Sequence, residues 1–275
     1  TALADNNTVT FGKHSGGGLD DATYTSDNCT ISVTSSDNVT SDNLPVNSFT
    51  IDTTAPLLTP VTPVPTLGND RNPYYTFHSN EVPVDITYGG PCSSSDNSSS
   101  VDNKTIRFNT LGDNDTYSNC TIRVTDSAGN QSNLLEVNSF TIDAIAPSLS
   151  PVIAVSTPTN DNTSSYTFHS NEAGDIIYGG TTGCRSDNIS HQSAVAGDNN
   201  IIFNELPDGP YSCTITVRDN ASNTSSPLSV NTFIIDTIDP IIDNVTDVPT
   251  PDNDSRPSYT FSSTDNGTIS YGGDC

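Results

Sequence analysis

An internal repeat constrains this chain more than any other feature of its sequence. The hexapeptide TFHSNE occurs at residues 76–81 and again at 167–172. A second motif, NSFTID or NTFIID, returns three times and ends in Asp52, Asp143 and Asp236, which are spaced 91 and 93 residues apart. A unit of this length is too long for a solenoid repeat and has the size of a small domain. The sequence therefore predicts small domains arranged in tandem.

The repeat register divides the chain into four parts. Residues 53–143 and 144–236 each span a complete unit. Residues 1–52 correspond to the C-terminal part of a unit, and residues 237–275 correspond to the N-terminal part. Together the two partial units contain 91 residues, which is one period. We expect the partial unit 237–275 to be completed by residues 1–52, either of a neighbouring chain or of a longer chain.

Short runs of alternating apolar and polar residues recur within each unit. In the first complete unit they occupy residues 74–78, 86–88, 105–108, 120–124 and 137–142. The runs are rich in β-branched and aromatic residues and are bounded by Asn, Asp, Gly, Pro or Ser, as half-buried strands are. No segment has a sustained period of 3.6 residues. Together with Leu57 and Leu58, each unit has about seven short strands, which predicts an all-β fold of tandem immunoglobulin-like β-sandwiches. The segment DGPYSC at 208–213 is similar to a tyrosine corner.

The composition limits the possible functions. The formal net charge of −25 leaves no basic groove for nucleic acid. The acidic residues are spread through the repeats, either as a solvated surface or as groups that bind divalent cations. No apolar run is long enough to span a membrane. The hydrophobic content of 32% suits several small cores, and the regular alternation argues against disorder, which is the competing interpretation of so polar a chain.

The six cysteines keep the register of the repeat. Within the complete units the expected disulfides are Cys92–Cys120 and Cys184–Cys213, each closing a loop of about 28 residues. Cys29 and Cys275 are the two halves of the same pair in the partial units, so we expect them to join neighbouring units. A zinc site is the alternative, but no CxxC motif or histidine pair accompanies these cysteines. Disulfides predict an oxidising, extracellular setting.

Several segments resemble one known family. NSFTIDTTAP, YGG followed by Cys, and CTIRVTDSAGN are similar to the bacterial immunoglobulin-like (Big-type) repeats of very large extracellular surface proteins and adhesins. The resemblance covers essentially the whole chain, and the DTTAP joint and the TDSAGN turn carry most of it. It implies an extracellular or cell-surface stalk or fibre, with calcium that stiffens the joints between domains. The first repeat departs from the pattern, because VTSSDNVTS at 33–41 lacks the Asp-led turn, which argues against a metal role there.

Calcium is the cofactor that the residue types favour, since Asp and Asn side chains supply the oxygen ligands that it prefers. The candidate ligands are the Asp of each joint, the acidic residue of the loop that follows, and the Asp and Asn of the DSAGN and DNASN turns: Asp52, Asp143, Asp236, Asp70, Asp161, Asp126, Asp219, Asn130 and Asn223. The alternative is that these residues only form turns and bind backbone amides.

No catalytic motif supports an enzyme. GxSxG, HExxH and phosphate-binding loops are absent from the sequence. The sequence instead predicts a structural segment of an extracellular filament or stalk, whose partner is a second copy of itself or the remainder of a longer tandem chain. An adhesin region whose loops bind a glycan or a protein of a partner cell is the second hypothesis. An accessory domain of an enzyme encoded outside these residues is the third.

Overall fold

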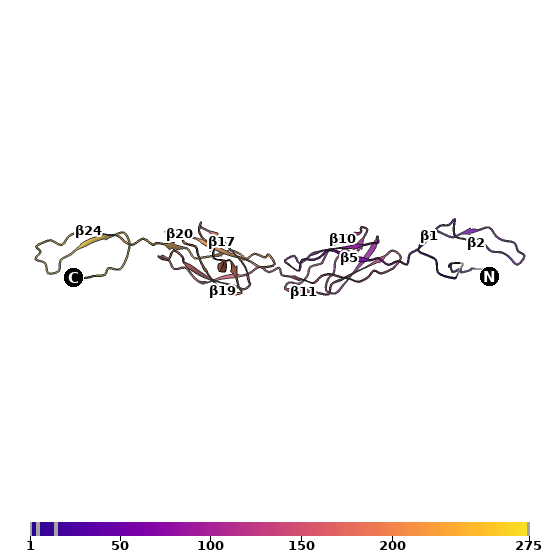
Figure 1. Cartoon of the computed structure of the whole chain (residues 1–275), viewed down its shortest axis with the longest axis horizontal. Helices are drawn as coiled ribbons and strands as arrows, with labels where there is room; N and C mark the ends of the chain where they lie inside the picture. Colours follow the sequence, from indigo (N-terminus) through magenta and orange to yellow (C-terminus); the bar gives the residue numbers. More distant parts are fainter. Residues whose placement is uncertain (1, 4–5, 14–15, 274–275) are drawn as a thin grey trace. The chain divides into compact units, whose positions relative to one another are not determined.

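The computed structural model describes residues 2–3, 6–13 and 16–273 (Figure 1). The chain consists of two compact units, Thr1–Ile145 and Ala146–Cys275. Within the described residues, one turn of 3-10 helix, η1 (Ile189–His191), is the only helical element; all other regular structure is β-strand. The fold is therefore all-β, as the alternating sequence pattern predicts.

The first unit contains a complete β-sandwich between residues 58 and 142. One sheet has the order β10-β7-β5, a second has the order β13-β12-β8-β9, and a third has the order β11-β14-β6. In the third sheet β14 and β6 run parallel, and the other pairs are antiparallel. The strands are β5 (Leu58–Thr62), β6 (Leu67–Gly68), β7 (Tyr74–Ser79), β8 (Val84–Gly89), β9 (Ser98–Ser99), β10 (Asn103–Arg107), β11 (Asp115–Tyr117), β12 (Thr121–Asp126), β13 (Leu135–Glu136) and β14 (Phe140–Ile142).

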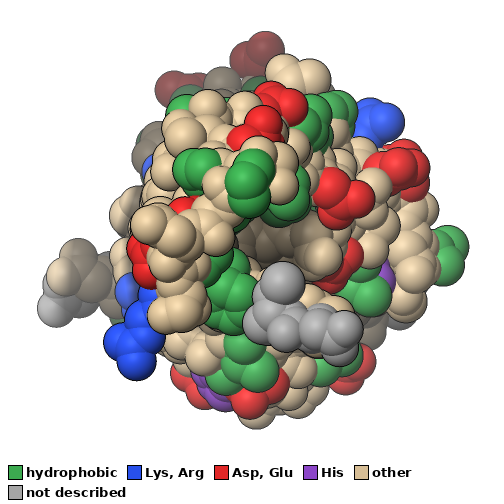
Figure 2. Space-filling model, turned by 90° about the vertical axis from the view of Figure 1, so that its left-hand side faces the viewer, with side chains coloured by type: hydrophobic (Ala, Val, Ile, Leu, Met, Phe, Trp, Pro, Cys, Tyr) green, Lys and Arg blue, Asp and Glu red, His purple; other side chains and the backbone are tan. Residues whose placement is uncertain are grey.

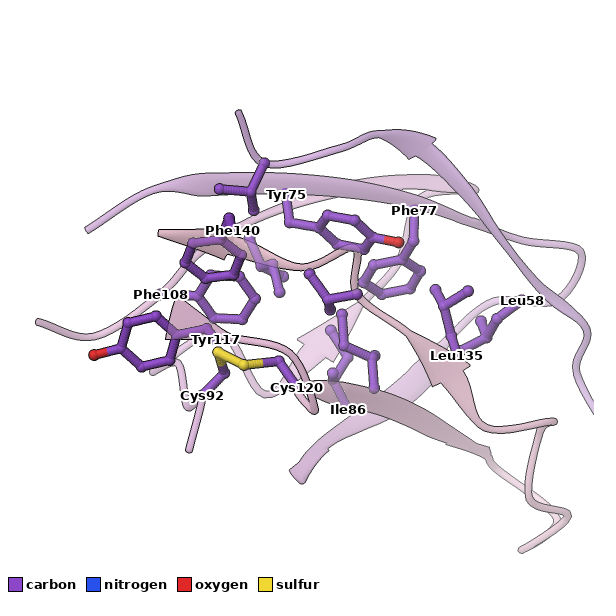
Figure 3. Close-up of a cluster of buried hydrophobic side chains, with 14 of the residues drawn as sticks. Leu58, Tyr75, Phe77, Ile86, Cys92, Phe108, Tyr117, Cys120, Leu135 and Phe140 are labelled. Atoms are coloured by element: carbon purple, nitrogen blue, oxygen red, sulfur yellow. A yellow bond between two sulfur atoms is a disulfide. The ribbon is translucent and has the colours of Figure 1, made fainter. Parts of the chain in front are cut away.

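The core of this sandwich follows from the two-residue period of its strands. Along β7, Tyr75, Phe77 and Ser79 are buried, whereas the residues between them are at least partly exposed. Phe77 packs in one cluster with residues of the other sheets (Figure 3). In the same cluster the rings of Tyr117 and Phe140 stack with their centroids 5.2 Å apart. One thin aromatic core thus holds the sheets together.

The first unit also contains part of a second sandwich. Strand β1 (Ala22–Tyr24) pairs with β4 (Phe49–Ile51), and β2 (Thr30–Ile31) pairs with β3 (Leu44–Pro45). These four strands belong to the partial unit that the repeat register places at residues 1–52.

The second unit repeats the sandwich of the first. Its sheets have the orders β15-β16-β19, β18-β17-β21-β22 and β20-β23, and they enclose a second core. An additional hairpin, β24-β25, follows this sandwich. The strands are β15 (Leu149–Ile153), β16 (Ser165–Ser170), β17 (Gly174–Gly180), β18 (Ser193–Ala194), β19 (Gly197–Ile202), β20 (Gly209–Tyr211), β21 (Cys213–Arg218), β22 (Leu228–Ser229), β23 (Phe233–Ile235), β24 (Ile242–Thr246) and β25 (Thr260–Ser263).

The number of strand segments differs from the expected seven, because two long strands are each divided. Between β5 and β6, Pro63 and Pro65 have no N–H group to continue a ladder. Between β13 and β14 the side chain of Asn138 replaces backbone pairing. Its Oδ1 accepts a hydrogen bond from the Val64 N–H at 3.0 Å, and its Nδ2 donates to the Val64 carbonyl at 2.8 Å. Asn231 holds Val155 in the same way in the second unit.

Two disulfides close the sandwiches in equivalent places. Cys92–Cys120 and Cys184–Cys213 have Cα–Cα distances of 5.3 and 5.5 Å, and all four residues are buried. Each bond joins the loop after the YGG strand to the start of the strand that pairs with it. Among the described residues Cys29 has no disulfide partner, and Cys275 lies outside them, so the expected Cys29–Cys275 bond stays a prediction.

The expected tyrosine corner is present in the second unit. The Tyr211 hydroxyl donates to the Pro207 carbonyl at 2.7 Å. In the first unit Tyr117 makes a variant of this contact, in which its hydroxyl accepts from the Gly112 N–H at 2.6 Å. Both bonds fix the loop that leads into β20 or β11.

Candidate metal centre at the domain joint

The joint is the segment that follows β4 in the first unit and begins with Asp52. The Asp52 Oδ1 atom accepts a hydrogen bond from the Thr54 N–H at 3.2 Å. The next two joint aspartates make the same turn: Asp143 accepts from the Ile145 N–H, and Asp236 accepts from the Ile238 N–H. The turn-forming role that the sequence left open is thus present at every joint. This role uses one carboxylate oxygen, and the second oxygen of Asp52 remains for another contact.

The DSAGN turn between β12 and β13 lies beside this joint. Asp126 Oδ1 accepts from the N–H groups of Ala128 and Asn130, at 2.8 and 2.9 Å. The Asn130 side chain donates to Asp126 Oδ2 and also to the Asp52 carbonyl, at 2.9 and 3.0 Å. Burial opposes ionisation of Asp126, but these hydrogen bonds outweigh it and hold the pKa of the carboxyl below its usual value. Asp126 is therefore an ionised group in a fixed position at neutral pH.

Glu81 completes a group of three carboxylates. Oxygen atoms of Asp52, Glu81 and Asp126 all lie within 4.8 Å of one another. Burial raises the pKa of Glu81, and the negative charges of Asp52 and Asp126 raise it further. The arrangement concentrates negative charge that a cation would neutralise. Because all the donors are hard oxygens without thiol or imidazole, the set fits Ca²⁺ rather than zinc or copper.

The sequence repeats this set. In register, Asp143, Glu172 and Asp219 take the places of Asp52, Glu81 and Asp126. Within the second unit the DNASN turn has the same geometry, since Asp219 accepts from both the backbone N–H and the side-chain amide of Asn223 at 2.9 Å. In the partial units, Asp236 and Asp265 are the equivalents of the first two residues, whereas Ser35 stands in place of the third.

Other predicted ligands lie elsewhere. Asp70 accepts from the Asn72 N–H at 2.8 Å, and Asp161 accepts from the Thr163 N–H at 2.9 Å. Both are turn residues that precede β7 and β16, and neither is part of the carboxylate group of the first joint. Asn130 and Asn223 use their side-chain nitrogens to hold the turns.

The repeated hexapeptide TFHSNE contains a residue that the sequence interpretation missed, Glu81. Its neighbours have scaffold roles: Phe77 is in the core, the Ser79 hydroxyl donates to the Glu81 carbonyl at 2.8 Å, and Asn80 Oδ1 accepts from the Leu57 N–H at 2.6 Å. The signal was the exact return of the motif, including its acid, at Glu172.

A second missed group is one aspartate in the loop before each tyrosine corner. Asp21 Oδ1 accepts from the N–H and the hydroxyl of Thr53, at 3.0 and 2.7 Å. Hydrogen bonds from Thr53 and Thr54 lower the pKa of Asp21. Asp113 and Asp208 bind the residue after the joint aspartate in the same way. The sequence signal is an Asp three or four residues before Tyr24, Tyr117 and Tyr211.

The part of the chain that the structure describes has no helix long and apolar enough to cross a membrane.

Comparison with known proteins places the chain by fold. No protein-family model and no curated protein matches its sequence. Similar solved structures include the fibronectin(III)-like modules of Clostridium thermocellum CbhA, at 12% identity and a TM-score of 0.35, covering 65% of this chain and 93% of that one. The D00-D0 domain of Intimin matches at 15% identity and a TM-score of 0.30, covering 66% of this chain and 98% of that one. The Bacteroides ovatus surface protein SGBP-B, solved with a mixed-linkage heptasaccharide, matches at 13% identity and a TM-score of 0.18, covering 89% and 63%. The chain is similar to these proteins in its all-β, tandem immunoglobulin-like architecture.

Proposed function

We propose that the chain is a structural segment of an extracellular, cell-surface stalk or filament, built from immunoglobulin-like repeats of the bacterial Big type. The observation that carries this proposal is the scaffold role of what repeats. The shared motifs supply core aromatics, disulfides, turn residues and joint contacts, and the repeated Phe77 and Phe168 are fully buried. A motif that recurs in every domain stabilises each domain, whereas a catalytic group needs to occur only once. No enzymatic role is proposed.

The disulfides support the extracellular location, because such bonds persist in oxidising compartments. Both are buried in equivalent places of two domains, so they are part of the repeated scaffold. The carboxylate group of Asp52, Glu81 and Asp126 supports the calcium component of the proposal. These three residues would hold the ion, which would tie the joint to the DSAGN turn and so restrict bending there.

Surface labelling tests the proposal. Intact cells of the source organism are incubated with an antibody raised against residues 53–143 and examined by electron microscopy, before and after treatment with an external protease. We expect label along fibres or stalks outside the cell, and loss of that label after proteolysis. Label that appears only in permeabilised cells would contradict an extracellular structural role.

A second candidate function, adhesion, rests on the loop after the YGG strand of the second unit. This loop carries η1, and Ile189 at its tip is 83% exposed. The equivalent loop of the first unit has a different sequence, PCSSSDNSSS. Binding of the purified chain to a glycan array or to partner cells, with Ile189→Asp as the test variant and Val101→Asp as the control, separates this function from a spacer role. Equal binding by both variants, or none by the unmodified chain, would remove this candidate.

A further inference from the structure

Residues 22–51 have the fold of the C-terminal half of a sandwich. The pair β1-β4 has the register Ala22↔Ile51 to Tyr24↔Phe49, and the pair β11-β14 of the complete domain has the equivalent register Asp115↔Ile142 to Tyr117↔Phe140. The pair β2-β3 likewise matches β12-β13 residue by residue. This half therefore has native strand pairing without the rest of its sandwich.

The core side of this half is exposed. Val33 is 48% exposed and Leu44 is 66% exposed, whereas their equivalents Val124 and Leu135 are 0% and 6% exposed. Phe49 is partly exposed as well, although its equivalent Phe140 is buried. The half-sandwich thus presents the apolar face that is covered in the complete domain.

Residues 242–271 have the fold of the opposite half. The pair β24-β25 has the register Ile242↔Ser263 and Asn244↔Phe261, with a bulge before Thr246. The pair β15-β16 of the complete domain has the same register and the same bulge. Here too the core positions are exposed: Ile269 and Tyr259 are 56% and 55% exposed, against 8% and 1% for their equivalents in the second unit.

These exposed residues surround an open hollow. Ile242, Phe261 and Ile269 line it, together with Pro240 and residues 265–268. Figure 2, in which the side that carries β24 in Figure 1 faces the viewer, shows hydrophobic side chains gathered around a hollow. Nothing else in the described part of this unit covers Ile242 or Ile269, which remain 68% and 56% exposed.

In the complete domains these two faces cover each other. Val124 lies opposite Ile86 and Ile122 lies opposite Tyr88 in the β12-β8 ladder. By the repeat register, Val33 would lie opposite Ile269, and Ile31 would lie opposite Tyr271. Each half thus supplies the residues that the other half leaves uncovered.

The asparagine contact between β13 and β14 provides an independent match. Asn138 holds Val64, and Asn231 holds Val155, with two hydrogen bonds each. The equivalent asparagine of the third sandwich is Asn47, in one half, and the equivalent valine is Val248, in the other. Val248 is 36% exposed. The two halves are therefore complementary in polar as well as apolar contacts.

We propose that residues 20–52 of one chain and residues 237–273 of a second copy form one immunoglobulin-like sandwich, an inference that rests on the proposed filament function. The direction of the strands favours a second copy over closure within one chain. In the complete domain the first and last strands, β6 and β14, are parallel, so the chain enters at one end of the sandwich and leaves at the other. Joining different surfaces in this head-to-tail manner does not close on itself and extends into a filament.

Two charge variants of the 275-residue chain test the shared sandwich. Phe49→Asp damages the first half, and Phe261→Asp damages the second. Thr50→Asp and Thr260→Asp are the matched controls, because these neighbouring residues are exposed on the opposite face of the same strands. Light scattering after gel filtration measures the mass, and circular dichroism verifies that the two complete domains remain folded.

We expect the unmodified chain and both controls to form oligomers in multiples of 29.0 kDa that grow with concentration. Each Phe→Asp variant should associate at least about 100-fold more weakly, because an unpaired charge would be buried. An equimolar mixture of the two variants should form dimers and nothing longer, since one intact half remains on each chain. Oligomers of either variant alone, or a mixture that stays monomeric, would overturn the shared sandwich.

The mass of native material decides between a second copy and a longer chain. A reduced, denatured mass near 29 kDa, with higher multiples before reduction, supports separate copies joined through Cys29 and Cys275. A single much larger reduced mass would overturn the second-copy assignment, because the missing half would then belong to the same polypeptide. Surface labelling remains informative in either case, so a failure of this inference is distinguishable from a failure of the filament function.

Discussion

Removing the disulfide of one complete domain should destabilise that domain by an amount set by the length of the loop. Cys92 and Cys120 are 28 residues apart, and Cys184 and Cys213 are 29 apart. The loop-entropy relation gives about 3.6 kcal/mol at 25 °C for either crosslink. For a domain of about 90 residues, a loss of this size lowers Tm by roughly 15 to 30 °C.

Scanning calorimetry measures the effect on the Cys92→Ala/Cys120→Ala variant, and Cys184→Ala/Cys213→Ala is the matched control in the second unit. Each variant should move one unfolding transition and leave the other in place. Since all four cysteines are buried, the alanine variants also lose sulfur packing. The unmodified protein, refolded under reducing conditions, isolates the crosslink itself. A shift of less than about 5 °C in that reduced protein would refute the entropic argument.

Three further predictions follow from charges and buried hydroxyls. Glu81→Gln should raise the stability of the first unit in chelator, because it removes a carboxylate that is held against two others; it should also abolish the gain of about 2.7 kcal/mol expected at a calcium concentration of 100 Kd, whereas Glu136→Gln should change neither quantity in urea unfolding. Tyr75→Phe should stabilise the fold by about 1 kcal/mol in the same assay, since no protein group lies within hydrogen-bond distance of this buried hydroxyl; a loss of stability would show that the hydroxyl has a partner. Burial raises the pKa of Tyr88 and of Tyr178 to about 12, so the stability that they contribute is complete below pH 10 and is lost as the pH rises toward 12; tyrosinate absorbance that appears before any loss of circular dichroism would contradict this order.

The repeat made much of the fold predictable from the sequence. Because equivalent residues recur at fixed spacing, the strand that contains Phe77 and the pairing of Cys92 with Cys120 could each be inferred twice. The strand signals were local, since alternation and flanking turn residues determine where a strand forms. The division of the first strand at Pro63 and Pro65 was also present in the sequence, but an estimate of about seven strands did not use it.

The candidate metal centre was predictable only in part. Asp52 and Asp126 were identified by residue type and turn chemistry. Glu81 was not, because its role depends on a turn that brings it near Asp126, a residue 45 positions later in the chain. The side-chain contacts of Asn138 could not be inferred for the same reason, since Val64 lies 74 residues earlier. Contacts between distant segments need the three-dimensional arrangement of the strands, and no local pattern encodes them.

The parallel pairing of β6 with β14 has a consequence for a protein that carries load. The Thr141 N–H donates to the Thr66 carbonyl, and the Asp143 N–H donates to the Gly68 carbonyl, at 2.9 and 3.0 Å. A pull on the two ends of the domain acts along these strands in opposite directions, so it loads the bonds between them together, in shear, instead of opening them one after another. The second unit has the same pairing around Thr159, whose N–H donates to the Ile234 carbonyl and whose carbonyl accepts from Asp236. Each domain would therefore resist tension abruptly and then yield in a single step, which suits a tether that must hold a cell surface against flow.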